Sequence, residues 1–149
     1  MTLKQKIYDY YLQQVNDKIA QLQNVLADLK ESGANETKST AGDKHETALA
    51  MLQIEQANIR AQLKEVQQQL AALQKINPAL SLSNIVNGCL IKTDKGYLLL
   101  SIAGGKTTID GHIVMAISPQ SPLGQQLLQV KDGTVVTVNT TVYVIESIE

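Results

Sequence analysis

The sequence predicts an α+β fold, in which an N-terminal antiparallel α-helical coiled-coil hairpin precedes a small β-rich domain with one short helix. Three observations lead to this prediction. Apolar residues recur every three or four positions through the first half of the chain, which is the period of an amphipathic helix. A Gly- and polar-rich break that begins near Gly33 divides this half into two helices. After Pro78 the pattern changes to short apolar runs separated by turn residues, which is typical of strands.

Each of the two predicted helices carries a single apolar stripe. The first stripe consists of Leu3, Ile7, Tyr11, Val15, Ile19, Leu22, Leu26 and Leu29. The second consists of Leu49, Leu52, Ile59, Leu63, Val66, Leu70, Leu73 and Ile76. A helix with one apolar stripe is stable only when the stripe is buried, and the nearest partner is the other helix. Residues 1–78 are therefore predicted to form a hairpin domain whose tip lies at about residues 33–48. A parallel coiled coil between two chains is the alternative.

Residues 79–149 are predicted to form the β-rich domain, with a mostly antiparallel sheet. The turn signal Asp94-Lys95-Gly96 separates two apolar runs and so predicts a β-hairpin. Further strands are expected at residues 113–117, 134–139 and 141–148. Ser121 suits the N-cap of a short helix over residues 123–128, and Pro122 suits its first position.

Three further expectations concern the surface of this domain. We interpret Gly104-Gly105-Lys106 as a hairpin turn and His112 as a turn residue. We also expect three lysines to gather at one edge of the sheet and to meet an acidic surface of a partner; these are Lys92, Lys95 and Lys106.

The composition excludes several classes of function. The chain has 149 residues and a net charge of −1, so no overall basic field draws it to nucleic acid. Aromatic residues are scarce, with five Tyr and no Phe or Trp, which counts against a function built on base stacking. The single Cys89 suits a buried core position, and no Cys/His cluster has zinc-site spacing. Because no signal peptide or membrane span is evident, we expect a cytoplasmic protein. We also expect a monomer without a cofactor of its own.

The predicted tip carries two acids, Asp43 and Glu46, at the start of the second helix. Residues three apart on a helix face the same way, so both carboxylates can reach one hard cation or one bound water. Two ligands do not complete an octahedral Mg²⁺ site, so a partner must supply the rest. The same spacing also fits a capping box with Asp43 at the N-cap; if Thr40 is the N-cap instead, Glu46 has no capping role. His45 points elsewhere on the helix, and we interpret it as solvent-exposed.

Two motifs resemble those of a known family. The tip Gly42-Asp43-Lys44-His45-Glu46-Thr47-Ala48, and the segment 117–128 with its Ser-Pro-Leu motif, resemble the tip and the C-terminal signature of the bacterial Gre transcript-cleavage factors. The resemblance covers nearly the whole chain in the same order. It implies a C-terminal domain of FKBP-like fold, without isomerase activity, that docks on RNA polymerase.

The resemblance also implies a mechanism. The hairpin of a Gre factor enters the secondary channel of the polymerase, where its tip acids lie close to the 3′ end of the nascent RNA. By position, Asp43 and Glu46 are then the acids that help hold a second Mg²⁺ and orient the attacking water. The polymerase itself hydrolyses the backtracked RNA, so the factor is not an enzyme on its own.

The chain departs from the Gre pattern next to these acids. Thr47 replaces an Asn, and Leu49 and Ala50 replace an acid and an aromatic residue. A similar Asp-x-x-Glu-x-Ala tip occurs in regulators of the DksA type, which use the same channel without cleaving RNA but usually carry a zinc-binding Cys cluster. A non-cleaving channel regulator is therefore the second hypothesis, and a coiled-coil adaptor is the third.

Overall fold

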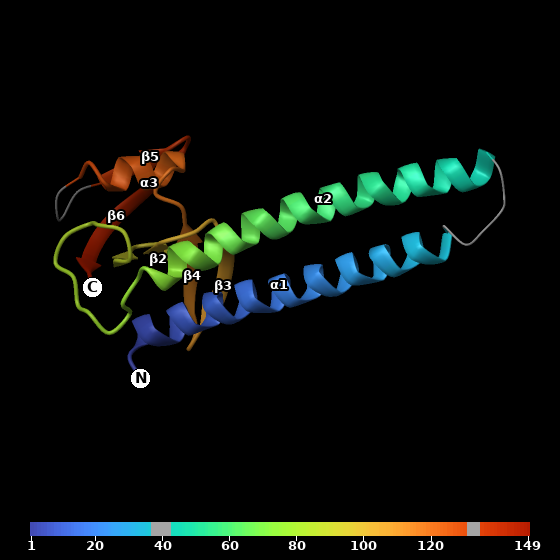
Figure 1. Ribbon diagram of the computed structural model, residues 1–149. Helices are drawn as coiled ribbons and strands as arrows, with labels where there is room; N and C mark the ends of the chain where they lie inside the picture. Colours follow the sequence, from blue (N-terminus) through green and yellow to red (C-terminus); the bar gives the residue numbers. More distant parts are fainter. Residues whose placement is uncertain (37–42, 131–134) are drawn as a thin grey trace. The chain divides into compact units, whose positions relative to one another are not determined.

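The computed structural model describes residues 1–36, 43–130 and 135–149 and has an α+β fold, as predicted (Figure 1). The helices are α1 (Leu3–Glu36), α2 (Asp43–Gln74) and α3 (Pro122–Leu127). The strands are β1 (Leu90–Thr93), β2 (Gly96–Leu100), β3 (Gly105–Ile109), β4 (His112–Ile117), β5 (Val135–Val138) and β6 (Thr141–Ile148). Two compact units divide the chain: Met1–Gln13 with Ala71–Glu149, and Gln14–Leu70. No helix in the described ranges is both long and apolar enough to span a membrane.

The strands form one mixed sheet in the order β3-β4-β2-β1-β6-β5. Four of the five neighbouring pairs are antiparallel, which confirms the mostly antiparallel prediction. The predicted turn joins β1 to β2, because Thr93 pairs with Gly96 across it. The parallel pair β2–β4 was not anticipated from the sequence. It arises because β3 lies between β2 and β4 in the chain but pairs on the far side of β4.

The interpretation of Gly104-Gly105-Lys106 as a hairpin turn was wrong. Gly105 begins β3, and Lys106 is a strand residue that pairs with Met115 of β4. The turn comes later, at Asp110 and Gly111, both of which have positive φ angles. His112 follows this turn as the first residue of β4, not as a turn residue.

The three lysines expected at one edge of the sheet do not gather there. Lys106 lies on the edge strand β3, whereas Lys92 lies on β1, and β4 and β2 separate the two strands. Lys92 forms an ion pair with Glu146 across to β6, with an N···O distance of 3.9 Å. The Nζ atom of Lys95 lies 3.7 Å from a carboxylate oxygen of the neighbouring Asp94. Strand order, which local sequence does not reveal, keeps these charges apart.

Alternation along β1 and β2 gives the sheet two buried faces. Ile91, Leu98 and Leu100 belong to the core cluster that also contains Leu123 and Leu127 of α3. The intervening residues Leu90 and Leu99, at 1% and 0% exposure, are buried on the opposite face. Because the sheet is covered on both faces, the sequences of its central strands are nearly continuous apolar runs.

A β-bulge in β6 keeps two isoleucines in the core. Lys92 pairs with Ser147 but the next residue, Thr93, pairs with Ile145, so Glu146 is the extra residue. Without the bulge, Ile145 and Ile148 would point to opposite faces, because they are an odd number of residues apart. With it, both pack in the same cluster and Glu146 stays exposed.

Helix α3 confirms the predicted cap. Ser121 has an extended backbone, and its hydroxyl accepts a hydrogen bond of 3.0 Å from the Gly124 N–H. Pro122 occupies the first turn, where its missing N–H has no consequence. The predicted helix over residues 123–128 is therefore confirmed to within one residue at each end.

The first turns of α1 share a compact unit with the sheet, and Tyr11 links the two. Its hydroxyl donates to the carbonyl oxygen of Gly105 at 2.7 Å and accepts from the Ala116 N–H at 3.2 Å. Tyr8 donates to the carbonyl of Leu73 at 2.7 Å, which joins the start of α1 to the end of α2. These bonds satisfy the hydroxyls of side chains that are otherwise buried.

We expect this unit to lose stability at alkaline pH through Tyr11. Burial, chiefly, raises the pKa of its hydroxyl from 10.0 to about 12. Between these values the unfolded chain releases the proton while the folded chain keeps it, so stability falls as the pH rises. The loss attributable to Tyr11 reaches roughly 3 kcal/mol near pH 12. Urea unfolding of the wild type and of Tyr11→Phe at several pH values from 9 to 12 would measure it. Parallel pH profiles for the two proteins would contradict the assignment.

Candidate functional site

The predicted tip, at about residues 33–48, includes the end of α1 and the start of α2. Helix α1 ends at Glu36 and α2 begins at Asp43. Glu46 lies in the first turn of α2, and its side chain is exposed. Thr40, and the side chains of Asp43 and His45, are outside the described part of the structure. The structure therefore does not describe the distance between the two carboxylates. It also does not show whether Asp43 or Thr40 is the N-cap of α2.

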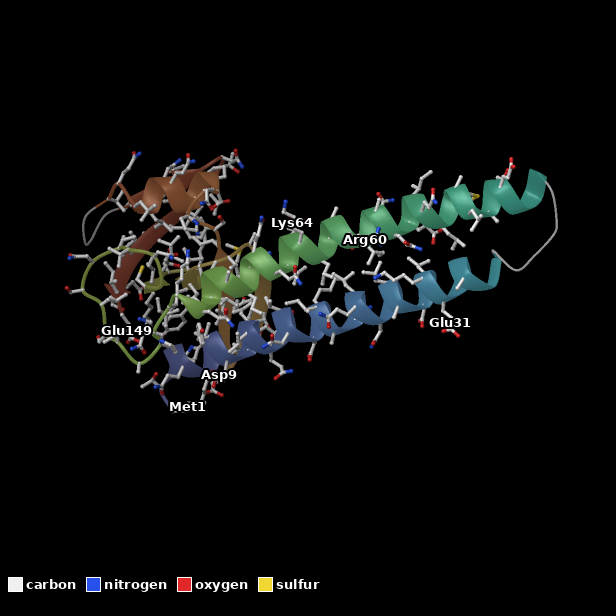
Figure 2. All side chains as sticks on the ribbon, in the orientation of Figure 1. Met1, Asp9, Glu31, Arg60, Lys64 and Glu149 are labelled. Carbon is white, nitrogen blue, oxygen red and sulfur yellow. The ribbon has the colours of Figure 1, made fainter. Side chains whose placement is uncertain are left out.

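The two helices run in opposite directions and pack together through their apolar stripes (Figures 1 and 2). Val15 and Leu22 of α1 are buried, with 5% and 3% exposure. Toward the tip the seam is shallower: none of the side chains that the structure describes between residues 23 and 70 is fully buried. Gln56, which lies between Leu52 and Ile59 of the second stripe, donates to the carbonyl oxygen of Leu29 on α1 at 3.4 Å.

Two shallow grooves follow this seam. One, of about 280 Å³, is lined by Val25 and Leu29 of α1 and by Ile59 of α2, among others. The other, of about 320 Å³, is closer to the tip and is lined by residues that include Gly33 and Leu49. The distal part of the hairpin is therefore held together by modest packing of half-buried side chains.

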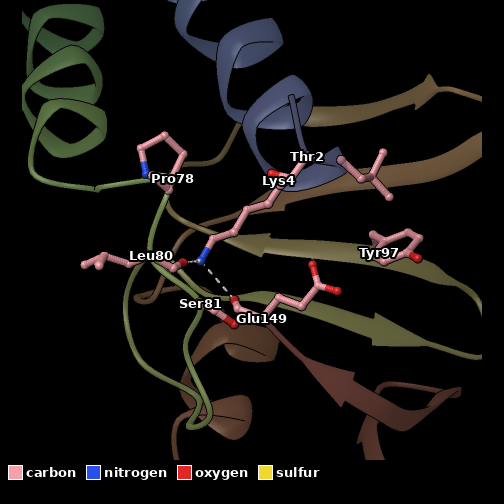
Figure 3. Close-up of a pocket in the computed structure, with 9 residues that line it drawn as sticks. Thr2, Lys4, Pro78, Leu80, Ser81, Tyr97 and Glu149 are labelled. Carbon is pink, nitrogen blue, oxygen red and sulfur yellow. Dashed lines mark hydrogen bonds between the residues drawn. The ribbon is translucent and has the colours of Figure 1, made fainter.

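A separate pocket, of about 400 Å³, surrounds Lys4 at the start of α1 (Figure 3). The Lys4 residue is only 3% exposed, and its ammonium donates to the carbonyl oxygens of Leu80, at 2.8 Å, and Glu149, at 3.0 Å. Burial lowers the pKa of this amine, while the nearby Cys89 and Glu149 raise it. Lys4 thus ties the beginning of α1 to the segment after Pro78 and to the end of β6.

Lys4 was not predicted from the sequence as a residue of interest. The available signal was its position, three residues before Ile7 and four before Tyr8, on the buried side of the helix. A lysine at such a position either reaches solvent with its tip or finds internal acceptors. Here it finds two main-chain carbonyls, so we assign it a structural role.

Other residues with reactive or titratable side chains have structural roles as well. Cys89 is fully buried, as predicted, and burial raises the pKa of its thiol, so that the reactive thiolate is disfavoured. His112 packs edge-to-face against Tyr97, with ring centroids 5.3 Å apart. In the described ranges, no three His, Cys, Asp or Glu side chains lie close enough together to hold a metal ion.

Comparison with models of protein families, with curated proteins and with solved structures gave no match to this chain. The functional inference therefore depends on the tip. There, the exposed side chain of Glu46 presents a carboxylate to solvent in the first turn of a helix of 32 residues. Such a group can supply an oxygen ligand to a hard cation that a partner holds.

Proposed function

We propose that this chain is an RNA polymerase accessory factor of the Gre type, whose hairpin enters the secondary channel and whose tip acids support cleavage of backtracked RNA. The observation that carries the proposal is a long two-helix arm with an exposed acid at its far end. The arm is built from helices of 34 and 32 residues. From Gln14 to Glu36, α1 alone extends about 33 Å at 1.5 Å per residue.

The chemistry of the tip suits a factor that completes another protein's site. Asp43 and Glu46 provide two carboxylates, which is half or less of the ligand set of Mg²⁺. In a two-metal displacement, one ion activates the attacking water and the other stabilises the leaving oxygen. We propose that the tip acids help hold the second Mg²⁺ at the polymerase active site and orient the water, while the polymerase performs the hydrolysis. The β-rich region, for which we propose an FKBP-like fold, would dock on the polymerase.

A non-cleaving channel regulator is the second candidate, and Leu49 favours it. In the Gre pattern an acid stands at this position. Here the side chain is half-buried and lines the groove next to Gly33 of α1, so it contributes to packing and not to the charge of the tip. A tip with fewer acids would bind in the same channel with a weaker hold on a metal ion.

We expect the protein to accelerate RNA cleavage by its cognate polymerase. The assay uses a transcription complex stalled in a backtracked state with labelled RNA and Mg²⁺, and it follows the release of short 3′ fragments with and without the protein. Faster release supports the leading proposal. Binding to the polymerase without faster release would assign the chain to the second candidate. Absence of binding would rule out both.

A further inference from the structure

The structural role of Lys4 leaves one of its hydrogen-bond donors unused. A lysine ammonium has three N–H donors, and the carbonyl oxygens of Leu80 and Glu149 accept two of them. Among the residues that the structure describes, the third donor has no acceptor, and no side-chain carboxylate forms an ion pair with the ammonium. Lys4 is only 3% exposed, and a cation at such depth is normally paired with an anion. The described part of the protein therefore supplies no counter-ion for this buried cation.

The start of α1 adds two further donors without acceptors. Thr2 and Gln5 cap the helix reciprocally: the Gln5 N–H donates to the Thr2 hydroxyl at 3.2 Å, and the Thr2 N–H donates to the Gln5 side-chain oxygen at 2.9 Å. The main-chain N–H groups of Leu3 and Lys4 have no such partner within the described ranges. The first turn carries no acidic side chain to balance the positive end of this helix of 34 residues.

The three unused donors lie at the same end of α1. Free N–H groups at the start of a helix point toward its N-terminus, and helix side chains lean in the same direction. Figure 3 shows the Lys4 side chain extending from the start of α1 to Leu80 and Glu149. An anion placed beside the ammonium is therefore also favoured by the positive end of the helix.

The pocket beside Lys4 is large enough for a small molecule. Its volume of about 400 Å³ lies in the range of small-molecule sites. It is lined by residues 2–4, residues 78–81, Tyr97 and Glu149. Leu80, which is 56% exposed, offers an apolar surface in this lining. The Glu149 carboxylate is turned toward Tyr97 and away from the Lys4 ammonium, so it leaves the ammonium without an ionic partner (Figure 3).

We propose that this pocket binds a small organic molecule through a single anionic group, a carboxylate or a phosphate, which accepts hydrogen bonds from the Lys4 ammonium and from the N–H groups of Leu3 and Lys4. The apolar part of the ligand lies against Pro78 and Leu80. The Glu149 carboxylate disfavours a second negative group, so the ligand carries only one. The inference goes beyond the proposed function and does not depend on it, because all of these residues belong to the unit that contains the sheet.

The test is a titration of the isotope-labelled full-length chain with benzoate and, separately, with phenyl phosphate, followed by two-dimensional NMR. Benzamide, which has the shape of benzoate without its charge, is the control ligand. We expect the amide signals of Leu3 and Lys4 to shift and saturate with at least one of the two anions, and benzamide to cause no saturable shift. The anion that binds more tightly shows whether the site prefers a carboxylate or a phosphate.

Three variants connect the binding to the pocket. Ser81→Trp places a large side chain in the lining while leaving both hydrogen bonds of the Lys4 ammonium in place. Ser83→Trp is its matched control, at an exposed position outside the lining. We expect Ser81→Trp to weaken binding on the order of tenfold or more, and Ser83→Trp to leave it unchanged. Lys4→Met keeps the length of the side chain without its charge and should abolish saturable binding. Circular dichroism shows whether this variant folds, and if it does not, Ser81→Trp decides.

The outcomes either support the site or overturn it. Saturable binding of an anion that Ser81→Trp weakens and Ser83→Trp does not supports it. Shifts that do not saturate, that benzamide reproduces, or that persist unchanged in Ser81→Trp overturn it, as does wild-type affinity in a folded Lys4→Met variant. None of these measurements involves RNA polymerase, so failure of this inference leaves the proposed function to its own test.

Discussion

Replacing Gly124 with Ala is expected to lower the free energy of unfolding by about 3 kcal/mol or more, on the scale of a severe overpacking defect. A Cβ atom at this position would overlap the carbonyl oxygen of Ser118 and lie 3.0 Å from the Cα atom of Pro119. The Ser118 carbonyl cannot easily move, because it accepts hydrogen bonds from both the N–H and the hydroxyl of Ser121, at 3.1 and 2.7 Å. The substitution would therefore displace α3 from the core to which Leu123 and Leu127 belong.

The sign of this effect makes the prediction specific. In an unconstrained helix, Gly→Ala stabilises by about 1 kcal/mol, because it removes backbone entropy from the unfolded chain. Urea unfolding monitored by circular dichroism would measure the change in midpoint. Gln125→Ala, at an exposed position on the same short helix, serves as the control and should change stability by less than about 0.5 kcal/mol. A midpoint for Gly124→Ala at or above that of the wild type would show that α3 does not pack as described.

The largest expected effect on activity concerns the tip acids. Asp43→Asn and Glu46→Gln remove the negative charges while keeping the size of each side chain. If the carboxylates support a metal-bound transition state in the polymerase, each substitution should slow the stimulated release of RNA fragments by roughly 10²-fold, the scale typical of losing one preorganised electrostatic contact. Affinity for the polymerase should change much less, because docking uses the rest of the chain.

Glu65→Gln provides the matched control for charge. Glu65 is an exposed acid on the same helix, 19 residues beyond Glu46. This spacing corresponds to about 28 Å along the helix axis, so Glu65 is remote from the proposed chemistry. Its substitution should leave cleavage unchanged. Unaltered cleavage by both tip variants, with the wild type active, would show that the acids serve only to cap α2, as the Asp-x-x-Glu spacing alone would allow.

The sequence by itself determined the elements whose cause is local. The period of the two apolar stripes predicted α1 and α2, and the Ser121-Pro122 pair predicted the start of α3. The turn at Asp94 and Lys95 was also predicted correctly, because turn formation depends on a few adjacent residues. The role of Asp43 and Glu46 stays a prediction, because their spacing fits a helix cap as well as a metal ligand pair and local sequence does not distinguish the two.

The tertiary structure alone decided the features that depend on residues far apart in the chain. Strand β3 is short, begins with a glycine and lies at the sheet edge, so its apolar pattern was too weak to separate it from a turn. Strand order placed Lys92 and Lys106 on strands that are not neighbours. The acceptors of Lys4 lie 76 and 145 residues away in the sequence. The exposure of Ile54 likewise became evident only once the side of α2 that packs against α1 was known. Periodicity within a segment shows that a side must be buried, but the contacts that bury it are set by how distant segments pack.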